Sequence, residues 1–541
     1  MKRNRVLALV LASLASQACQ PSDPKNPGTW IAQLSDATAQ KRIEAVRQLR
    51  KLKAKQAAPQ VAPLLKDQMV KEEAALALQD LGGPSEVPAL IEAVDTTVGS
   101  GSDQATRLAN RTNARIAEAL GGIGDARAGP SLLRLARSQD GLVRIAAVQA
   151  LGAIGFKEAA PELAHIVDDE SAAPLLIKKA IVSLSQLRDP ATIPALLHGL
   201  VLERQGVGFL AESSYALFLI GAPSVEPLLK VAQDQDAAYL AWAKENNRAP
   251  AGTYAKAALV LGDLGDARAV PVLLAKLKYT DSDPNPGTAK LLSNLVRELA
   301  ANSLGRLRAR EAAGPILSLV QTRDPQDAEL VAFASEALVW IGDPAQAKEL
   351  AKRAQAGAIR SRLSAAQAAS MLGDGPLAKD LLAMAAREEK GAAQGCVKAL
   401  AELQLPVEKE KDACALVAAQ FGELVKPLEA AGRCAGTAAC WMQQLGEKEP
   451  LVRARAAYEL GRETYGQAVP ALVRAAADPD LRVRTAAVRA LDWLLPQPEA
   501  KPLLKAAAAS LGGQLAAEQG KVEVSKVNED LRRLQTRLSR L

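Results

Sequence analysis

Few side chains in this 541-residue chain have the types and spacing that chemistry requires, and the cysteines are the most informative of them. Four of the five cysteines lie in one region, at Cys396, Cys414, Cys434 and Cys440. An even set of this kind in an oxidising compartment forms disulfides, with three possible connectivities. We favour Cys434–Cys440, across the short loop between them, and Cys396–Cys414, across the neighbouring repeat boundary. A zinc site is the alternative, but there is no Cys-x2-Cys pair and no nearby histidine.

Candidate catalytic residues are scarcer still. The chain has two histidines, His165 and His198, and both have apolar neighbours in stretches that read as helices. We interpret them as packing or surface residues rather than as bases. The sequence contains no phosphate-binding glycine loop, no nucleophile elbow and no histidine pair at metal-ligand spacing. We therefore expect no catalytic residue, no metal, no cofactor and no enzymatic activity.

One loop has the oxygen-ligand alternation of a calcium site. Asp281, Asp283 and Asn285 occupy alternate positions, and a glycine follows at 287. However, Pro286 stands where the turn glycine of a calcium loop should be, and Leu292 stands where the closing glutamate should be. We expect an ordinary turn-rich loop.

Aromatic residues make up only 3% of the chain, yet several of them gather around two insertions, at 234–253 and 278–290. These insertions fall in consecutive repeats, so we expect them side by side on one edge. Binding residues concentrate on loops that a rigid scaffold holds. We predict that the aromatic residues bind a protein or peptide partner: Tyr239, Trp242, Tyr254 and Tyr279. Alternatively, their rings cover the ends of their own helices.

The elements that must position these residues are helices. In the stretch 138–155, SQDGLVRIAAVQALGAIG, Asp140 can cap a helix that Gly155 ends. Val143, Ala147, Ala150, Leu151 and Ile154 fall on one helical face. Close copies return at 449–461 and 478–495, and weaker ones recur along the chain.

Each such helix, which we call a second helix, follows a shorter first helix that often carries proline in an apolar phrase, as in PSEVPALI (84–91). Proline is tolerated in a helix's first turn, where the N–H has no intrahelical partner. The pair repeats every 30–45 residues or so, which is typical of a solenoid. We therefore predict an all-α fold, an α-solenoid of stacked antiparallel helix pairs. A third insertion occurs at 96–111.

The repeat resembles the HEAT family, in the short form called PBS-lyase HEAT-like repeats. The resemblance covers about residues 30–496 and rests on two sets of positions: Asp140, Val143, Arg144, Ala147, Leu151 and Gly155, and Asp480, Val483, Arg484, Ala487 and Leu491. It implies a superhelix with a long face suited to extended ligands. Some relatives resemble bilin lyases, which implies an alternative role as an enzyme or its accessory.

An arginine recurs in the second helices at 144, 453 and 484, in register with acidic residues at 140, 449 and 480. These arginines could form an exposed ligand-binding ladder. We favour instead a chain of charge-assisted bonds between consecutive repeats.

The N-terminus reads as an export signal. Residues 1–18 combine a basic start, a short apolar core and a small-residue end, typical of a signal peptide. Cys19 follows directly, and the segment resembles the lipobox of bacterial lipoproteins, although Ser16 and Gln17 depart from its pattern. The resemblance implies lipidation of Cys19, a tether over 19–29, and a periplasmic or outer-membrane location. Ordinary signal-peptide cleavage before Cys19 is the alternative.

The remaining organisation follows from composition. We expect HEAT-like repeats over 30–405 and 436–496, an irregular helical segment with cysteines over 406–435, and a C-terminal helical cap over 497–541. Val524, Val527, Leu531, Leu534, Leu538 and Leu541 form a heptad seam, which either folds back as a cap or pairs with another chain.

The charge does not indicate nucleic acid. The net charge of +7 is a small excess of 67 basic over 60 acidic residues, which fits a mixed solvated surface better than a nucleic-acid footprint. Together these features predict a non-catalytic, exported, lipid-anchored scaffold that binds a protein or peptide partner in the bacterial envelope.

Overall fold

The computed structural model describes residues 23–95, 99, 101, 103–406, 410–434, 436–519 and 526–541. The expected signal peptide, Cys19, the start of the tether, part of the 96–111 insertion and Val524 lie outside these residues. The chain divides into two compact units, 1–220 and 221–541.

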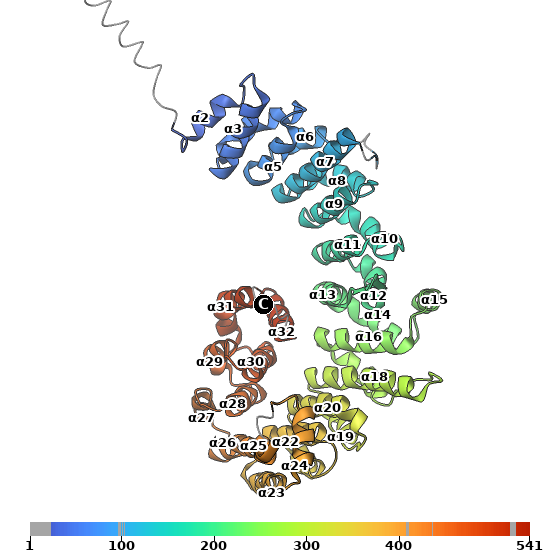
Figure 1. Ribbon diagram of the computed structural model, residues 1–541, viewed down its shortest axis with the longest axis vertical. Helices are drawn as coiled ribbons and strands as arrows, with labels where there is room; N and C mark the ends of the chain where they lie inside the picture. The colour runs from blue at the N-terminus through green and yellow to red at the C-terminus, as the bar shows by residue number, and fades with distance from the viewer. Residues whose placement is uncertain are drawn as a thin grey trace, which may run out of the picture. The chain divides into compact units, whose positions relative to one another are not determined.

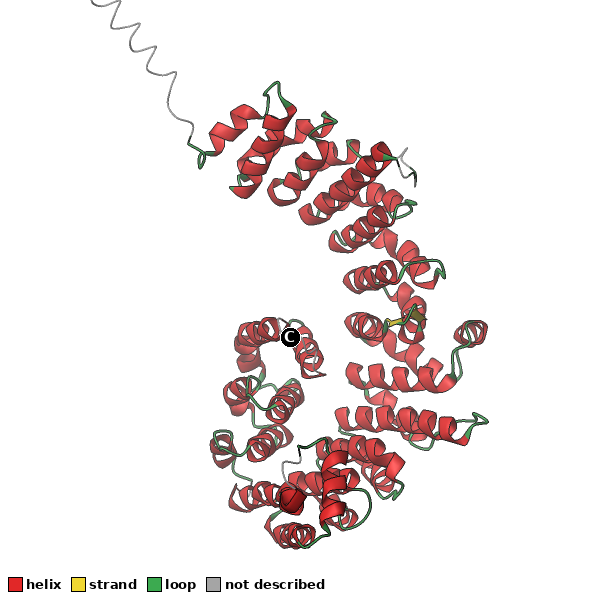
Figure 2. Ribbon diagram, viewed as in Figure 1, coloured by secondary structure: helices red, strands yellow, loops and turns green. Residues whose placement is uncertain are grey.

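The first unit is a stack of helix pairs (Figures 1 and 2). Two short antiparallel strands, β1 (Glu203–Arg204) and β2 (Val207–Gly208), form a hairpin before its last helix. Its α-helices are α2 (Pro27–Gln33), α3 (Ala39–Lys51), α4 (Ala58–Val61), α5 (Lys71–Leu81), α6 (Val87–Glu92), α7 (Gln104–Ile123), α8 (Gly129–Leu135), α9 (Gly141–Ala153), α10 (Ala160–Asp168), α11 (Pro174–Leu187), α12 (Ile193–Val201) and α13 (Leu210–Ile220).

The second unit continues the same pattern and ends in the helices α31 and α32. Its α-helices are α14 (Val225–Ala232), α15 (Ala237–Glu245), α16 (Pro250–Leu264), α17 (Val270–Lys276), α18 (Pro286–Arg306), α19 (Ala313–Val320), α20 (Ala328–Ile341), α21 (Ala347–Arg353), α22 (Ile359–Leu372), α23 (Ala378–Glu389), α24 (Ala393–Glu402), α25 (Ala413–Glu423), α26 (Val425–Cys434), α27 (Ala438–Gln444), α28 (Pro450–Arg462), α29 (Val469–Ala475), α30 (Leu481–Leu494), α31 (Lys501–Gln519) and α32 (Lys526–Leu538).

A 3-10 turn leads into most first helices, and proline then occupies one of the first two helical positions, as in α10, α12 and α29. This is where the sequence analysis expects proline to be tolerated. The 3-10 segments are η1 (Lys55–Ala57), η2 (Ala62–Lys66), η3 (Ala126–Ala128), η4 (Lys157–Ala159), η5 (Pro190–Thr192), η6 (Ala222–Ser224), η7 (Ala267–Ala269), η8 (Arg310–Ala312), η9 (Pro325–Asp327), η10 (Pro344–Gln346), η11 (Gly375–Leu377), η12 (Glu410–Asp412) and η13 (Gly466–Ala468).

Helix α9 shows how local signals set the repeat. The Asp140 side chain accepts hydrogen bonds from the backbone N–H groups of Leu142 and Val143, which satisfies two of the donors that a helix start leaves unpaired. The five residues of its predicted apolar face are all less than a tenth exposed. Gly155 follows the helix with a φ of 68°. The helical solenoid inferred from the sequence is confirmed.

The recurring arginine joins neighbouring repeats. Arg453 binds Asp478 of the next repeat at 2.8 Å and also donates to the carbonyls of the turn before its own helix. Arg42 binds Asp67 in the same way, at 2.6 Å, and Arg144 lies 3.9 Å from Asp169. Each of these pairs spans 25 residues, so the inter-repeat interpretation holds for Arg453 and Arg144 but not for the third predicted member, Arg484. Arg484 donates only to carbonyls of its own preceding turn.

Glycine lets consecutive second helices touch. A Cβ added at Gly461 in α28 would lie 2.7 Å from the Cα of Ala490 in α30. Small residues meet in the same way where α16 approaches α18, because a Cβ at Gly262 would lie 2.9 Å from the Cα of Ser303. Gly121, Gly152 and Gly305 occupy equivalent positions.

We expect Gly461→Ala to lower the free energy of unfolding by about 1–3 kcal/mol, because the added methyl forces α28 and α30 apart. The matched control is Gly395→Ala in α24, where a Cβ would meet nothing within 4 Å. There, higher helix propensity should raise stability by about 0.5 kcal/mol. Urea unfolding of both variants checks the pair, and equal effects would contradict the close-contact explanation.

The C-terminal helix folds back on its own chain. Val527, Leu531, Leu534 and Leu538 are buried against α30 and α31, which is the cap alternative for the heptad seam. An adjacent face of α32 takes part in what we call the C-terminal ion-pair network, formed by Asp263, Arg306, Arg489, Asp492, Asp530, Arg533 and Arg537. The network therefore links helices of the second unit that are more than 200 residues apart in the sequence. Stacking of neighbouring repeats alone does not produce such contacts.

No single described helix is long and apolar enough to cross a bilayer. The consecutive helical segments Leu210–Ile220 and Ala222–Ala232 meet the length and composition criteria only when they are taken together.

Candidate functional site

The two aromatic insertions meet as expected from their consecutive repeats. The rings of Tyr254 and Tyr279 lie edge to face, 5.3 Å apart, and the Lys276 ammonium lies 3.3 Å from the centre of the Tyr254 ring. Each phenol donates a 2.7 Å hydrogen bond to a carboxylate, Tyr254 to Asp234 and Tyr279 to Asp281. Burial is the main cause that raises both tyrosine pKa values and lowers the pKa of Lys276.

Only part of this cluster reaches the surface. Tyr239 and Tyr254 are 5% and 7% exposed, and the Tyr239 hydroxyl lies 3.0 Å from the Thr253 hydroxyl. Trp242 packs against Tyr239 at 5.6 Å and is half-buried, as is Tyr279. Partner binding by all four rings therefore does not fit this geometry, because two of them are used inside the fold. Trp242 and Tyr279 stay candidates.

The structure also shows where the candidate cysteines and histidines lie. Disulfides join Cys396 to Cys414 and Cys434 to Cys440, with Cα–Cα distances of 4.9 and 5.3 Å, which are the two favoured pairs. His198 Nδ1 lies 2.7 Å from Asp168, whereas His165 lies on the exposed side of α10.

The loop with calcium-like alternation uses its oxygens internally. Asp281 accepts from the N–H of Asp283 and from Tyr279, and Asp283 accepts from the N–H of Asn285. Asn285 in turn caps α18. The described residues contain no cluster of groups that could hold a metal ion.

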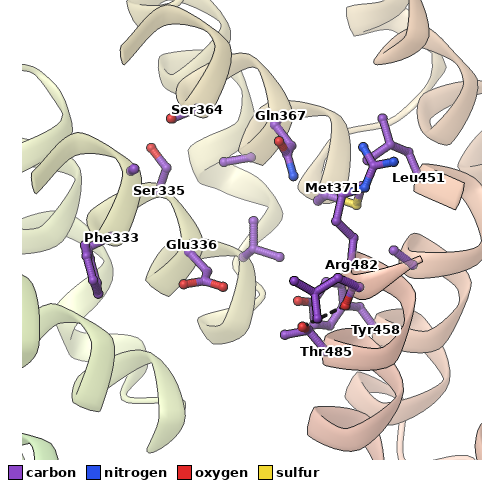
Figure 3. Close-up of a pocket in the computed structure, with 15 residues that line it drawn as sticks. Phe333, Ser335, Glu336, Ser364, Gln367, Met371, Leu451, Tyr458, Arg482 and Thr485 are labelled. Carbon is purple, nitrogen blue, oxygen red and sulfur yellow. Dashed lines mark hydrogen bonds between the residues drawn. The ribbon is translucent and has the colours of Figure 1, made fainter. Parts of the chain in front are cut away.

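A pocket of about 370 Å³ lies elsewhere in the second unit. One wall comes from α20 and α22 and the other from α28 and α30 (Figure 3). Its base is apolar: Val339, Met371, Leu451 and Tyr458 are each less than a tenth exposed. Leu481, which is 48% exposed, lies at its edge. A pocket of this size that combines apolar walls with a few polar groups is typical of ligand sites.

Buried arginines hold the two walls together. Arg462 of α28 donates to the carbonyl oxygens of Val339 in α20 and Met371 in α22, at 2.6 and 3.1 Å. Arg455 donates to the carbonyl oxygens of Ser370 and Gly373. These acceptors lie in the last turns of α20 and α22 or just beyond them, where intrahelical partners run out. The spacing of the walls is therefore fixed by hydrogen bonds across 82–123 residues.

Polar groups face the pocket in an uneven charge pattern. The Tyr458 hydroxyl accepts a hydrogen bond from the Trp340 indole at 3.3 Å, and burial raises its pKa to about 12, so it stays protonated at neutral pH. Arg482 on one wall is paired with Asp480 at 2.8 Å. Glu336 on the other wall has no ion pair with a described residue. The uncompensated charge at the pocket is therefore negative.

Sequence reasoning missed this pocket. Its residues come from four helices spread over about 150 positions, and no spacing within the chain brings them together. The sequence contained one indication of the contacts that form it. The phrase PLVRARAAYELGR has arginines at 455 and 462, on the helix face where neighbouring repeats have small or apolar residues.

Family models match several parts of the chain. The HEAT-repeat model matches residues 28–109, 105–176 and 439–516, and the PBS-lyase HEAT-like repeat matches residues 254–279. No curated protein matches the chain.

Solved structures resemble it at low identity. Yeast importin-β is 13% identical, with a TM-score of 0.40 over 92% of this chain and 69% of that one. The CpcE–CpcF complex of phycocyanin lyase from Nostoc is 18% identical, with a TM-score of 0.26 over 52% and 94%. Human deoxyhypusine hydroxylase is 20% identical, with a TM-score of 0.21 over 54% and 98%. These likenesses concern the helical fold alone.

Proposed function

We propose that this helical solenoid, parts of which match HEAT-repeat models, is a scaffold without catalysis of its own, which binds a segment of a partner protein in the pocket between α20, α22, α28 and α30. The observation that supports this proposal is that buried hydrogen bonds fix the spacing of the pocket walls. The space between the walls is not filled by side chains, as protein interiors are. Its exposed apolar edge at Leu481 suits a polypeptide that continues beyond the pocket.

Substitution at the edge of the pocket tests this proposal. The full chain, immobilised and incubated with the envelope fraction of its host, should capture a defined partner that mass spectrometry identifies. Leu481→Asp should reduce capture by about tenfold or more, because a carboxylate placed at the apolar edge must be desolvated on binding. Leu481 is half-exposed, so the variant should fold.

The matched control is Leu291→Asp in α18, where the leucine is 71% exposed and outside the pocket. It should capture the partner as the unsubstituted chain does. Equal capture by the unsubstituted chain and both variants would contradict a role for the pocket.

We further propose that the protein is exported and anchored by lipid at Cys19, in the periplasm or at the outer membrane. The two disulfides support export, because such bonds persist in oxidising compartments and are rare in the cytosol. Cys19→Ala should abolish labelling by a fatty-acid probe and release the chain from the membrane fraction.

The processed N-terminus distinguishes this proposal from its alternative. Mass spectrometry of the mature chain should find a modified Cys19 at the N-terminus. An uncleaved cytoplasmic chain with free thiols would instead favour the alternative, an enzyme or accessory related to HEAT-like bilin lyases.

A further inference from the structure

Three polar groups at the pocket keep hydrogen-bonding or charge-pairing capacity that the described residues do not take up. Ser335 is 2% exposed, and its hydroxyl makes no hydrogen bond with a described residue. Tyr458 accepts a hydrogen bond from Trp340, but its own hydroxyl proton meets no acceptor among the residues that the structure describes. Glu336 extends from α20 between the walls (Figure 3) and has no cationic partner among the described residues. Buried polar groups are normally paired, so an unpaired hydroxyl here points to a ligand.

The charged residues at the pocket favour a positively charged ligand. Arg482 already has Asp480 as its counter-ion, at 2.8 Å, and it is on the exposed side of its helix. Glu336 is half-buried and uncompensated. A half-buried carboxylate gains more from a cation than an exposed one, because water screens it less. An anionic group would meet repulsion from Glu336.

The apolar base of the pocket favours a ligand with a long apolar stem. Val339, Met371 and Leu451 offer an aliphatic surface with no charge, and Met371 can adapt to an irregular chain. Side chains of lysine and arginine combine a long apolar stem with a terminal positive charge. They are the common protein groups that cover such a surface and still reach a carboxylate at its edge.

We propose that the pocket binds a lysine or arginine side chain of the partner polypeptide, with its stem against Val339 and Met371 and its charged end at Glu336. The hydroxyls of Ser335 and Tyr458 lie on the same pocket lining and are available to the partner's polar groups. This proposal rests on the proposed function and specifies its ligand: a basic side chain flanked by apolar residues, rather than an acidic or purely apolar segment.

Short peptides test the proposal directly. The probe is a dye-labelled peptide, Gly-Leu-Lys-Leu-Gly, blocked at both ends and measured by fluorescence anisotropy with the full chain. Its comparison peptides replace the lysine with arginine, with Nε-acetyl-lysine or with glutamate. Acetylation removes the charge and keeps the stem, so it isolates the interaction with Glu336. The lysine and arginine peptides should bind about tenfold more tightly than the acetylated one, as expected for a half-buried charge pair.

Replacing the carboxylate of Glu336 is the second part of the experiment. Glu336→Gln is nearly isosteric and should bring the lysine and acetyl-lysine peptides to equal affinity. The control is Glu329→Gln, at an exposed position on the same helix outside the pocket, and it should preserve the preference. Equal binding of charged and acetylated peptides by the unsubstituted chain would overturn the proposal, as would a preference that survives Glu336→Gln or the absence of binding by every peptide. Partner capture that depends on Leu481 would still stand in those cases, so failure here is distinguishable from failure of the proposed function.

Discussion

Replacing Asp263 with asparagine is expected to lower the free energy of unfolding of the second unit by about 3–5 kcal/mol. The Asp263 side chain is fully buried in the C-terminal ion-pair network, 2.6 Å from Arg306 and 2.9 Å from Arg533. Removing one partner from a buried ion pair leaves the other charge without compensation, and this costs more than the pair itself contributes. With a neutral amide at position 263, the buried guanidinium groups of Arg306 and Arg533 would have one carboxylate fewer to pair with.

Two measurements check this prediction. Urea unfolding, with the two units treated as separate transitions, should show the loss in the unit that contains α32. Hydrogen exchange should show weaker protection of residues 526–541, because Arg533 connects that helix to α16. The control is Glu349→Gln, at an exposed pair with Lys352, which should change stability by about 0.5 kcal/mol or less. A loss no larger than the control's, with unchanged protection of α32, would show that the network does not hold the helix.

Arg462→Met is expected to cost about 3 kcal/mol, because it removes the hydrogen bond to Glu459 and leaves the buried carbonyls of Val339 and Met371 without those that Arg462 donates. Methionine keeps much of the volume, so the effect reports on the lost bonds rather than on a cavity. Arg462→Lys should be intermediate, since an ammonium cannot match the fork that reaches two helices. The exposed Arg310 provides a control, and Arg310→Met should be nearly neutral.

The position of Arg462 beside the pocket gives this prediction a second readout. With the Arg462 bonds removed and only those of Arg455 left, the wall formed by α28 and α30 should be held less firmly against α20 and α22. Capture of the partner should therefore fall in Arg462→Met at a temperature where the variant is still folded by circular dichroism. Full capture together with lower stability would mean that the arginine supports the fold without shaping the pocket.

The local features of the chain could be read from the sequence because their causes lie within one or two repeats. Asp140 caps the helix that follows it within three residues, and Arg453 finds Asp478 one repeat later, at the same spacing that brings Arg42 to Asp67. The cysteine pairs are separated by 18 and 6 residues. At such short range, helix geometry and the stacking of adjacent pairs leave few alternatives.

The aromatic edge could be predicted only in part. The sequence placed Tyr254 and Tyr279 together, because insertions in consecutive repeats must be neighbours. It could not tell that Tyr254 is buried and donates its hydroxyl to Asp234, while Tyr279 keeps part of its surface exposed. That difference depends on the packing of each ring, which periodicity does not encode.

The sequence by itself determined the helical repeat, the pairing of first with second helices, the inter-repeat arginine bonds and the region of the disulfides. Only the tertiary structure decided that α32 binds α16 and α18 through Asp530 and Arg533, and that α20, α22, α28 and α30 enclose a pocket. The physical reason is that curvature accumulates from small rotations at every repeat interface. No single repeat carries that sum, so contacts between helices 100 or more residues apart become visible only when the whole unit is folded.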